Sequence, residues 1–162
     1  MNLWAILQSL LILALANYAP VLAKKTFGTR LACPLDGGMT FFDKRVLFGP
    51  SKTVRGIVAS IAAASAGALI IGVRPELGAL MAASAMAGDL FSSFVKRRLN
   101  FPPSSQVPGL DQVPEALLPL LVGRHALSLS VVDILLAVAI FFVGEVFLAR
   151  LFYRLGFREQ PY

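Results

Sequence analysis

Residues 76–98 read ELGALMAASAMAGDLFSSFVKRR. The stretch begins with about 20 mostly apolar residues, the length that an α-helix needs to cross a bilayer's hydrocarbon core. Three consecutive basic residues, Lys96, Arg97 and Arg98, end it, and one carboxylate, Asp89, lies inside the apolar run. This segment predicts a membrane-spanning helix that carries a charged group near one membrane surface.

The composition of the whole chain agrees with this prediction. Of its 162 residues, 57% are apolar and only 15% are charged, whereas soluble domains are nearer half apolar and a quarter charged. The single cysteine, Cys33, excludes an internal disulfide scaffold. We therefore expect an all-α fold, a polytopic integral membrane protein with a polar site on its cytoplasmic side.

Hydropathy and segment length predict about five transmembrane helices in one domain, residues 1–162. One segment, residues 113–123, is short and contains Pro114 and Pro119, so its length alone fits either a spanning helix or a re-entrant piece. The expected spans are residues 1–23, 54–73, 76–95, 111–123 and 127–151, with cytoplasmic loops at 24–53 and 96–110.

The distribution of positive charge favours five spans. If the short segment crosses, 13 of the 15 Lys and Arg residues lie on one side; otherwise 11 do. The positive-inside rule then predicts an outside N-terminus and a cytoplasmic C-terminus in the cell membrane. Ala14-Leu15-Ala16 also resembles a signal-peptide cleavage site, but no Lys or Arg precedes the apolar run, so we interpret residues 1–23 as a span.

One stripe of the third expected span carries a carboxylate, two hydroxyl groups and an ammonium group. Ser92, Ser93 and Lys96 follow Asp89 by three, four and seven residues, so the four side chains share a helix face. An ionisable group inside a span is costly, which favours a functional role for Asp89. A structural Asp89–Lys96 ion pair is the alternative, and it leaves the other carboxylates unexplained.

Further carboxylates and cations lie in the two expected cytoplasmic loops. Such a mixture is typical of a metal-bridged polyphosphate site, because Mg²⁺ takes one or two carboxylates plus phosphate oxygens and the surplus cations meet the remaining charge. The loop cations alone also fit an ordinary positive-inside loop. The sequence lacks GxxxxGK[ST], which excludes a P-loop, and its one histidine, His125, is expected on the opposite side, which argues against a Ser-His-Asp triad. The charged residues concerned, in these loops or at the helix ends beside them, are Asp36, Asp43, Lys52, Arg55, Asp89, Lys96, Arg97 and Asp111, and Gln112 follows Asp111.

Short motifs in a fixed order carry a family resemblance over nearly the whole chain. They are Asn17-x-x-Pro20, Pro34-Leu35-Asp36-Gly37-Gly38, Phe42-Asp43, Phe48-Gly49, Lys52-Thr53-x-Arg55-Gly56, Gly88-Asp89-Leu90, Ser93-x-x-Lys96-Arg97-Arg98, Pro108-Gly109-Leu110-Asp111-Gln112 and Tyr153-Arg154-Leu155-Gly156. Their order and spacing resemble the CDP-archaeol synthase family, relatives of the CDP-diacylglycerol synthases (phosphatidate cytidylyltransferases). The chain departs from the family pattern three residues after Asp111, where Pro114, followed by Glu115, replaces an expected aspartate.

The resemblance implies five transmembrane helices and a reaction in which CMP passes from CTP to an isoprenoid glycerol phosphate, with Mg²⁺, releasing pyrophosphate. The implied partners are CTP, a lipid phosphate and membrane lipids; we expect no nucleic-acid partner. The implied metal ligands are Asp89 and Asp111, and the implied catalytic residues are Asp89, Ser93, Lys96 and Arg97. The implied nucleotide-binding residues are Asp36, Asp43, Lys52, Thr53, Arg55, Gly56 and Gln112.

Two other classes of protein remain as alternatives. A small transporter would use Asp89 as an ion site and would need a polar path to the outer side, where the spans are mostly apolar. A silent membrane scaffold would have kept the fold and lost activity through Pro114. The interpretation of the chain as an enzyme assigns no role to Asp133 or Glu145 in the last span.

Overall fold

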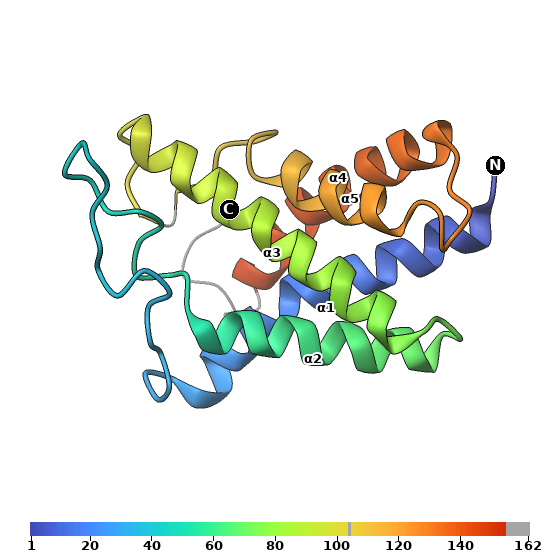
Figure 1. The fold of residues 1–162 in the computed structure, drawn as a ribbon, viewed down its shortest axis with the longest axis horizontal. Helices are drawn as coiled ribbons and strands as arrows, with labels where there is room; N and C mark the ends of the chain where they lie inside the picture. The colour runs from blue at the N-terminus through green and yellow to red at the C-terminus, as the bar shows by residue number, and fades with distance from the viewer. Residues whose placement is uncertain (104, 155–162) are drawn as a thin grey trace.

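The structure, a computed structural model, describes residues 1–103 and 105–154 and shows five helices there (Figure 1). The part of the chain that it describes forms no strand, only two isolated β-bridges, Pro34–Thr53 and Thr40–Val46. The expected all-α fold is confirmed. Leu155, Gly156 and Arg158, which entered the motif and charge arguments above, lie outside the described residues. The helices are α1 Leu3–Phe27, α2 Val54–Ile70, α3 Pro75–Arg98, α4 Gln112–Gly123 and α5 Val131–Arg154.

Three of these helices are long and apolar enough to cross a membrane by themselves: α1, α3 and the segment Val131–Leu148 of α5. The 17 residues of α2 reach about 26 Å, and the 12 residues of α4 only about 18 Å. The protein is therefore a multi-pass membrane protein, as expected. The number of crossings, five, stays a prediction, since α2 and α4 are both shorter than the hydrocarbon core of about 30 Å.

Successive helices run in opposite directions along the bundle, and α1–α2, α2–α3 and α3–α4 pack as neighbours (Figure 1). The two long connections, residues 28–53 and 99–111, consequently lie at one end. The two short connections, residues 71–74 and 124–130, lie at the other. This alternation gathers the polar loops on one side of the membrane.

Glycines let neighbouring helices approach closely. A Cβ atom on Gly78 of α3 would come within 2.6 Å of the carbonyl oxygen of Ala64 on α2. A Cβ on Gly88 would collide with the carbonyl of Pro114 at the start of α4. Small residues commonly serve this purpose in membrane proteins, where packing rather than water exclusion holds helices together.

Pro114 lies in the first turn of α4 and does not interrupt the helix. It is the third residue of the helix, where a backbone N–H has no helical partner, so a proline costs little. The next residue, Glu115, is 7% exposed and turned into the protein. The departure from the family pattern therefore leaves the helix intact and keeps a carboxylate at the neighbouring position.

Asp133, which had no role in the sequence interpretation, joins the start of α5 to the start of α1. Its Oδ2 accepts from the backbone N–H of Ser130 at 3.0 Å, and the Ser130 hydroxyl accepts from the N–H of Asp133 at 3.2 Å. This reciprocal capping box satisfies two helix-end donors. Oδ1 accepts from the N–H of Asn2 at 3.2 Å, so Asp133 has a structural role.

Gly78→Ala should lower the free energy of unfolding by about 1–3 kcal/mol, because the added methyl group meets a backbone carbonyl that cannot rotate away. Gly144→Ala on α5 is the matched control, since its added methyl group would have nothing within 4 Å and alanine favours a helix. Thermal unfolding of both variants in the same detergent checks this. Equal effects of the two substitutions would contradict the close α2–α3 contact.

Candidate functional site

A cavity of about 1020 Å³ opens at the end of the bundle that carries the two long loops. Residues from all five helices line it, among them Asn17 of α1, Gly56 of α2, Asp89 of α3, Gln112 of α4 and Glu145 of α5. Because every helix contributes, the cavity is a property of the whole bundle.

Charges of both signs line the cavity. The mixture predicted for a metal-bridged polyphosphate site is therefore present, and it is denser than the sequence interpretation assumed, since it also includes residues from α1 and α5. The cations are Lys24, Lys25, Lys52, Arg55 and Lys96, and the carboxylates are Asp89, Asp111, Glu115 and Glu145.

Lys52 forms a close charged contact in the cavity. Its Nζ lies 2.6 Å from both carboxylate oxygens of Asp89. Backbone pairing between the two ends of the first loop holds Lys52 there: Leu35 N–H donates to the Lys52 carbonyl at 2.8 Å. Thr53 then caps α2, its Oγ1 accepting from the N–H of Gly56 at 3.2 Å.

Lys96 pairs with the other carboxylate that was expected to bind metal. Its Nζ lies 2.7 Å from Oδ1 of Asp111 and also donates to the Ser105 carbonyl at 2.7 Å. The Asp89–Lys96 ion pair considered as an alternative does not occur. Each carboxylate is instead paired with a lysine from a different segment of the chain.

Asp36 lies outside the cavity lining and is 3% exposed. Its oxygens accept from the N–H groups of Gly49 and Phe48, both at 3.0 Å, and of Gly38 at 3.1 Å. Burial raises the pKa of Asp36, but these backbone donors outweigh it, so the pKa is lowered from its ordinary value. Asp36 therefore clamps the loop that presents Lys52, and its expected contact with nucleotide stays a prediction.

Asp43, Ser93 and Arg97 also lie outside the lining. Asp43 pairs with Arg98 at 3.0 Å. Arg97 is 5% exposed and donates to the Pro102 carbonyl at 2.9 Å, and Ser93 is 3% exposed. These contacts stabilise the loops around the cavity, and a direct role in binding or catalysis stays a prediction for all three.

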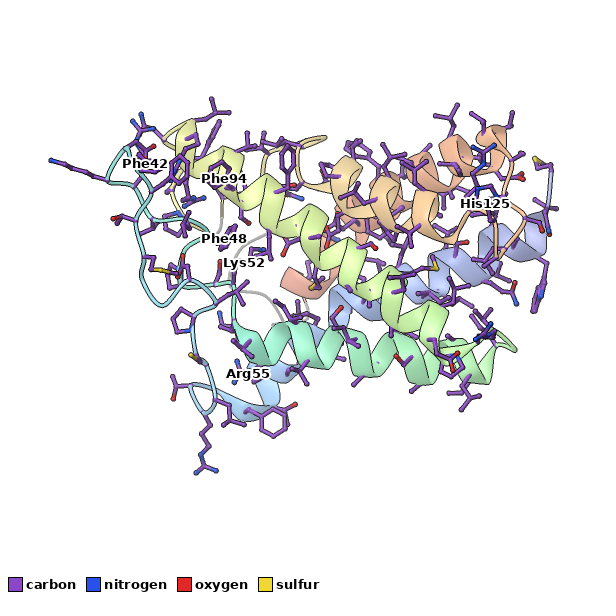
Figure 2. All side chains as sticks on the ribbon, in the orientation of Figure 1. Phe42, Phe48, Lys52, Arg55, Phe94 and His125 are labelled. Carbon is purple, nitrogen blue, oxygen red and sulfur yellow. The ribbon has the colours of Figure 1, made fainter. Side chains whose placement is uncertain are left out.

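Arg55 and Gln112 line the cavity and also hold its walls. The Arg55 guanidinium donates to the carbonyls of Gly28 and Arg30, which ties the start of α2 to the end of α1 (Figure 2). Gln112 is fully buried, and its Oε1 accepts from the N–H of Gly109 at 2.9 Å. Both side chains therefore combine a place in the lining with a structural contact.

The sequence interpretation missed the contributions of α1 and α5. Lys24 and Lys25 were interpreted only as topology signals, but α1 continues to Phe27 and carries both into the lining. Glu145 lies inside the last span, where an ionisable residue is by itself a sign of function. That rule was applied to Asp89, and it would have identified Glu145 as well.

The donor set of the cavity fits a magnesium ion that arrives with a nucleotide. Over residues 1–103 and 105–154, no three His, Cys, Asp or Glu side chains form a ready-made metal centre. Mg²⁺ bound to a nucleotide needs only one or two protein carboxylates, since phosphate oxygens and water complete its shell. Asp89 and Asp111 provide two such carboxylates in one cavity.

Fold and cavity together define a class of protein: a multi-pass helical membrane protein with a charged internal cavity at one membrane surface. A family model described as "CarS-like: CDP-archaeol synthase" matches residues 65–162. The CDP-archaeol synthase of Pyrobaculum calidifontis is 32% identical over 156 residues, covering 91% of this chain and 90% of that protein. The chain belongs to the CDP-archaeol synthase family.

Other relatives align over shorter stretches. The CDP-archaeol synthase of Thermococcus onnurineus is 39% identical over 109 residues, 60% of this chain and 61% of that protein. The one from Hyperthermus butylicus is 39% identical over 104 residues, 60% of this chain and 59% of that protein. A solved structure described as an intramembrane enzyme for archaeal membrane lipids biosynthesis has a TM-score of 0.63 and 31% identity, covering 85% of this chain and 90% of that one.

Asp36→Asn should lower the melting temperature at neutral pH, because an amide nitrogen would face backbone donors. Since the pKa of Asp36 is lowered in the folded protein, its stabilising contribution is present above the unfolded pKa and is lost as pH falls. The difference in melting temperature between parent and variant should therefore narrow from pH 7 toward about pH 3. A difference that is constant over this range would contradict the role of the ionised carboxylate.

Proposed function

We propose that the chain is a CTP-dependent cytidylyltransferase that transfers CMP to a membrane lipid phosphate. The products would be a CDP-activated lipid, for phospholipid biosynthesis, and pyrophosphate. The observation that carries this proposal is the pair of lysine–carboxylate contacts, Lys52–Asp89 and Lys96–Asp111, within one cavity of a CDP-archaeol synthase family member. By the name of the family, the lipid is an archaeol-type glycerol phosphate; phosphatidate presents the same reacting group.

The reaction would be a displacement at the α-phosphorus of CTP by an oxygen of the lipid phosphate. This nucleophile is already an anion, so no side chain has to activate it. The protein's task is then to align two repelling phosphate groups and neutralise their charge. The cations that line the cavity, Lys52, Arg55 and Lys96 among them, would do this.

Asp89 and Asp111 would hold the magnesium ion, which when bound supplies positive charge to the phosphate oxygens. For Asp89 to bind the metal ion, the Lys52 ammonium group would have to move away from the Asp89 carboxylate. Lys52 would then be available to bind phosphate. The same holds for Asp111 and Lys96. Burial alone would lower the pKa of Lys52, but the neighbouring carboxylates, Asp89 first among them, raise it above its ordinary value, so Lys52 would carry its positive charge when phosphate arrives.

We place the cavity on the cytoplasmic side of the cell membrane, with the N-terminus outside and the C-terminus inside. The two long loops and the helix ends beside them carry most of the cations, in agreement with the positive-inside rule. A cytoplasmic opening also gives the cavity access to a soluble nucleotide, while the lipid phosphate reaches it from the bilayer.

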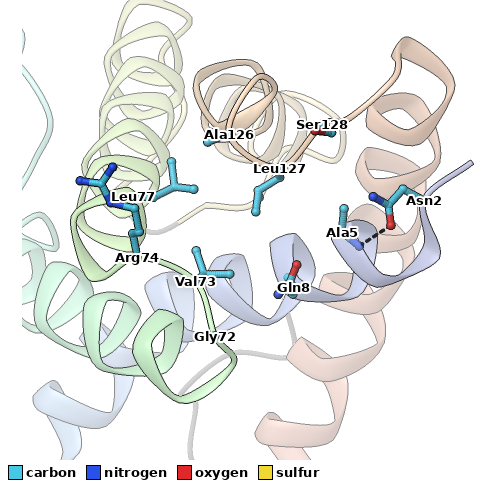
Figure 3. Close-up of a pocket in the computed structure, with 10 residues that line it drawn as sticks. All are labelled: Asn2, Ala5, Gln8, Gly72, Val73, Arg74, Leu77, Ala126, Leu127 and Ser128. Carbon is cyan, nitrogen blue, oxygen red and sulfur yellow. Dashed lines mark hydrogen bonds between the residues drawn. The ribbon is translucent and has the colours of Figure 1, made fainter.

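The packing between the two ends of the bundle argues against a transporter. A smaller cavity of about 320 Å³ lies at the opposite end, beside Gln8, Arg74 and Leu127 (Figure 3). Between it and the charged cavity, the bundle contains apolar side chains of zero exposure, such as Ile12 of α1 and Leu120 of α4. An ion path would have to cross this layer.

Asp89→Asn should abolish formation of CDP-lipid while the bundle stays folded. The substitution keeps the side chain's shape and removes the charge that a divalent cation needs. The assay uses purified protein in detergent with labelled CTP, Mg²⁺ and a panel of isoprenoid and fatty-acyl glycerol phosphates. Parent protein without product on any lipid would favour the silent scaffold, and undiminished turnover by the variant would make Asp89 structural.

Lys52→Gln and Lys96→Gln should each lower the rate at saturating CTP roughly a hundredfold, equivalent to about 3 kcal/mol in the transition state. Each removes one cation that neutralises phosphate charge. Arg74→Gln is the control, since Arg74 is exposed at the opposite end and pairs only with Glu76 among the contacts described. Activity within about threefold of the parent for both lysine variants would refute the charge-neutralising role.

A further inference from the structure

The middle of the first loop forms a small hairpin, residues 39–47, at the cavity end of the bundle (Figure 2). Leu47 N–H donates to the Met39 carbonyl at 3.1 Å, and Phe41 N–H donates to the Arg45 carbonyl at 2.8 Å. None of the hairpin's residues lines the charged cavity. Apart from Asp43, whose contact with nucleotide stays a prediction, the hairpin therefore has no part in the proposed reaction.

The hairpin is fixed against the last turn of α3. The rings of Phe41 and Phe94 meet edge to face with centroids 5.3 Å apart. The Arg98 guanidinium lies 4.8 Å from the Phe94 centroid and 5.1 Å from that of Phe41, and it donates to the Val46 carbonyl at 2.7 Å. The basic run that ends α3 marks the membrane surface, so these contacts hold the hairpin at the depth of the lipid headgroups.

Phe42 at the hairpin tip is 97% exposed (Figure 2). Apolar side chains of the segment that the hairpin packs against are exposed as well: Phe91 of α3 is 56% exposed outside the cavity lining, and Leu99 just after α3 is 59% exposed. Exposed apolar side chains thus occur both on the hairpin and on the last turns of α3, and an aromatic ring at such a place is typical of the membrane interface.

Lys44 occupies a position that normally favours glycine. Lys44 N–H donates to the Phe41 carbonyl at 2.8 Å, which makes residues 42–44 a three-residue hairpin loop, and its φ is +61°. Loops of this kind place a residue in the left-handed region, which costs a side-chain-bearing residue backbone strain. Asp43 is paired with both Arg98 and Arg45, and the Arg45 guanidinium also donates to the Arg98 carbonyl, so Lys44 is the residue that presents positive charge next to Phe42.

We propose that this hairpin is a membrane-interface anchor: Phe42 inserts into the interfacial layer of the bilayer that α3 spans, and Lys44 binds the headgroups of anionic phospholipids. Aromatic insertion and attraction between cations and anionic headgroups both strengthen such binding. The segment that follows the hairpin runs directly through Phe48 and Gly49 to Lys52. The anchor therefore steadies the segment that presents Lys52, and its existence does not depend on the proposed reaction.

Tryptophan fluorescence of the full chain in nanodiscs tests the anchor. Trp4 is the only tryptophan, so Phe42→Trp in a Trp4→Phe background reports from the hairpin tip alone. In anionic nanodiscs, lipids brominated near the headgroup end of the acyl chain should remove most of its emission, while aqueous iodide should have little effect. Phe91→Trp in the same background is the positive control for lipid contact.

Emission that iodide quenches and brominated lipid does not would overturn the anchor, because the tip would then stand in water. Protection from both quenchers would also overturn it, in favour of a contact with protein. Binding of anionic headgroups by Lys44 is tested by adding Lys44→Gln to the Phe42→Trp chain. The second substitution should reduce quenching of the tryptophan emission by brominated lipid in anionic nanodiscs and leave it unchanged in zwitterionic ones. Equal quenching with and without Lys44 in both lipids would refute binding of anionic headgroups.

Discussion

A charged group inside a membrane bundle has to be compensated, and the contacts Lys52–Asp89 and Lys96–Asp111 provide that compensation. Removing one partner of such a pair leaves the other charge without compensation in a partly buried place. The pairs therefore allow carboxylates and lysines to share a cavity lined by all five helices. The ion pairs can also be replaced by contacts with substrate, because each lysine can bind a phosphate group of the nucleotide and each carboxylate can bind the metal ion that accompanies it.

The first loop serves this arrangement from a distance. Lys52 precedes α2, and its ammonium group reaches Asp89 because the two ends of the loop pair with each other and Asp36 holds the backbone of Phe48 and Gly49. A flexible connection would leave Lys52 in water, where an ion pair is worth little. The length of the loop is thus explained by the need to fold back and fix one side chain.

The sequence predicted the apolar helices well and the side-chain partners poorly, for a physical reason. Hydropathy is a property of each segment, so α1, α3 and α5 were expected from composition and length alone. The partner of Asp89 depends on how a loop folds back, and within α3 itself Lys96 lies two turns away, too far to pair. Asp36 shows the same limit: a carboxylate beside glycines suits a ligand contact and a backbone clamp equally, and only the three N–H donors around it distinguish them.

The shortness of α4 explains how the cavity reaches into the membrane. Its start packs against Gly88, ten residues and therefore about 15 Å below the end of α3 at Arg98. The loop 99–111 has to descend beside α3 to that depth, and the Ser92 hydroxyl donates to the Leu110 carbonyl at 2.7 Å along the way. Non-helical backbone is tolerated at membrane depth only where it is buried in protein or lines a polar cavity. A longer α4 would fill the space that the loop 99–111 occupies beside α3. The position of Asp111 in the cavity therefore depends on both the short helix and the descending loop.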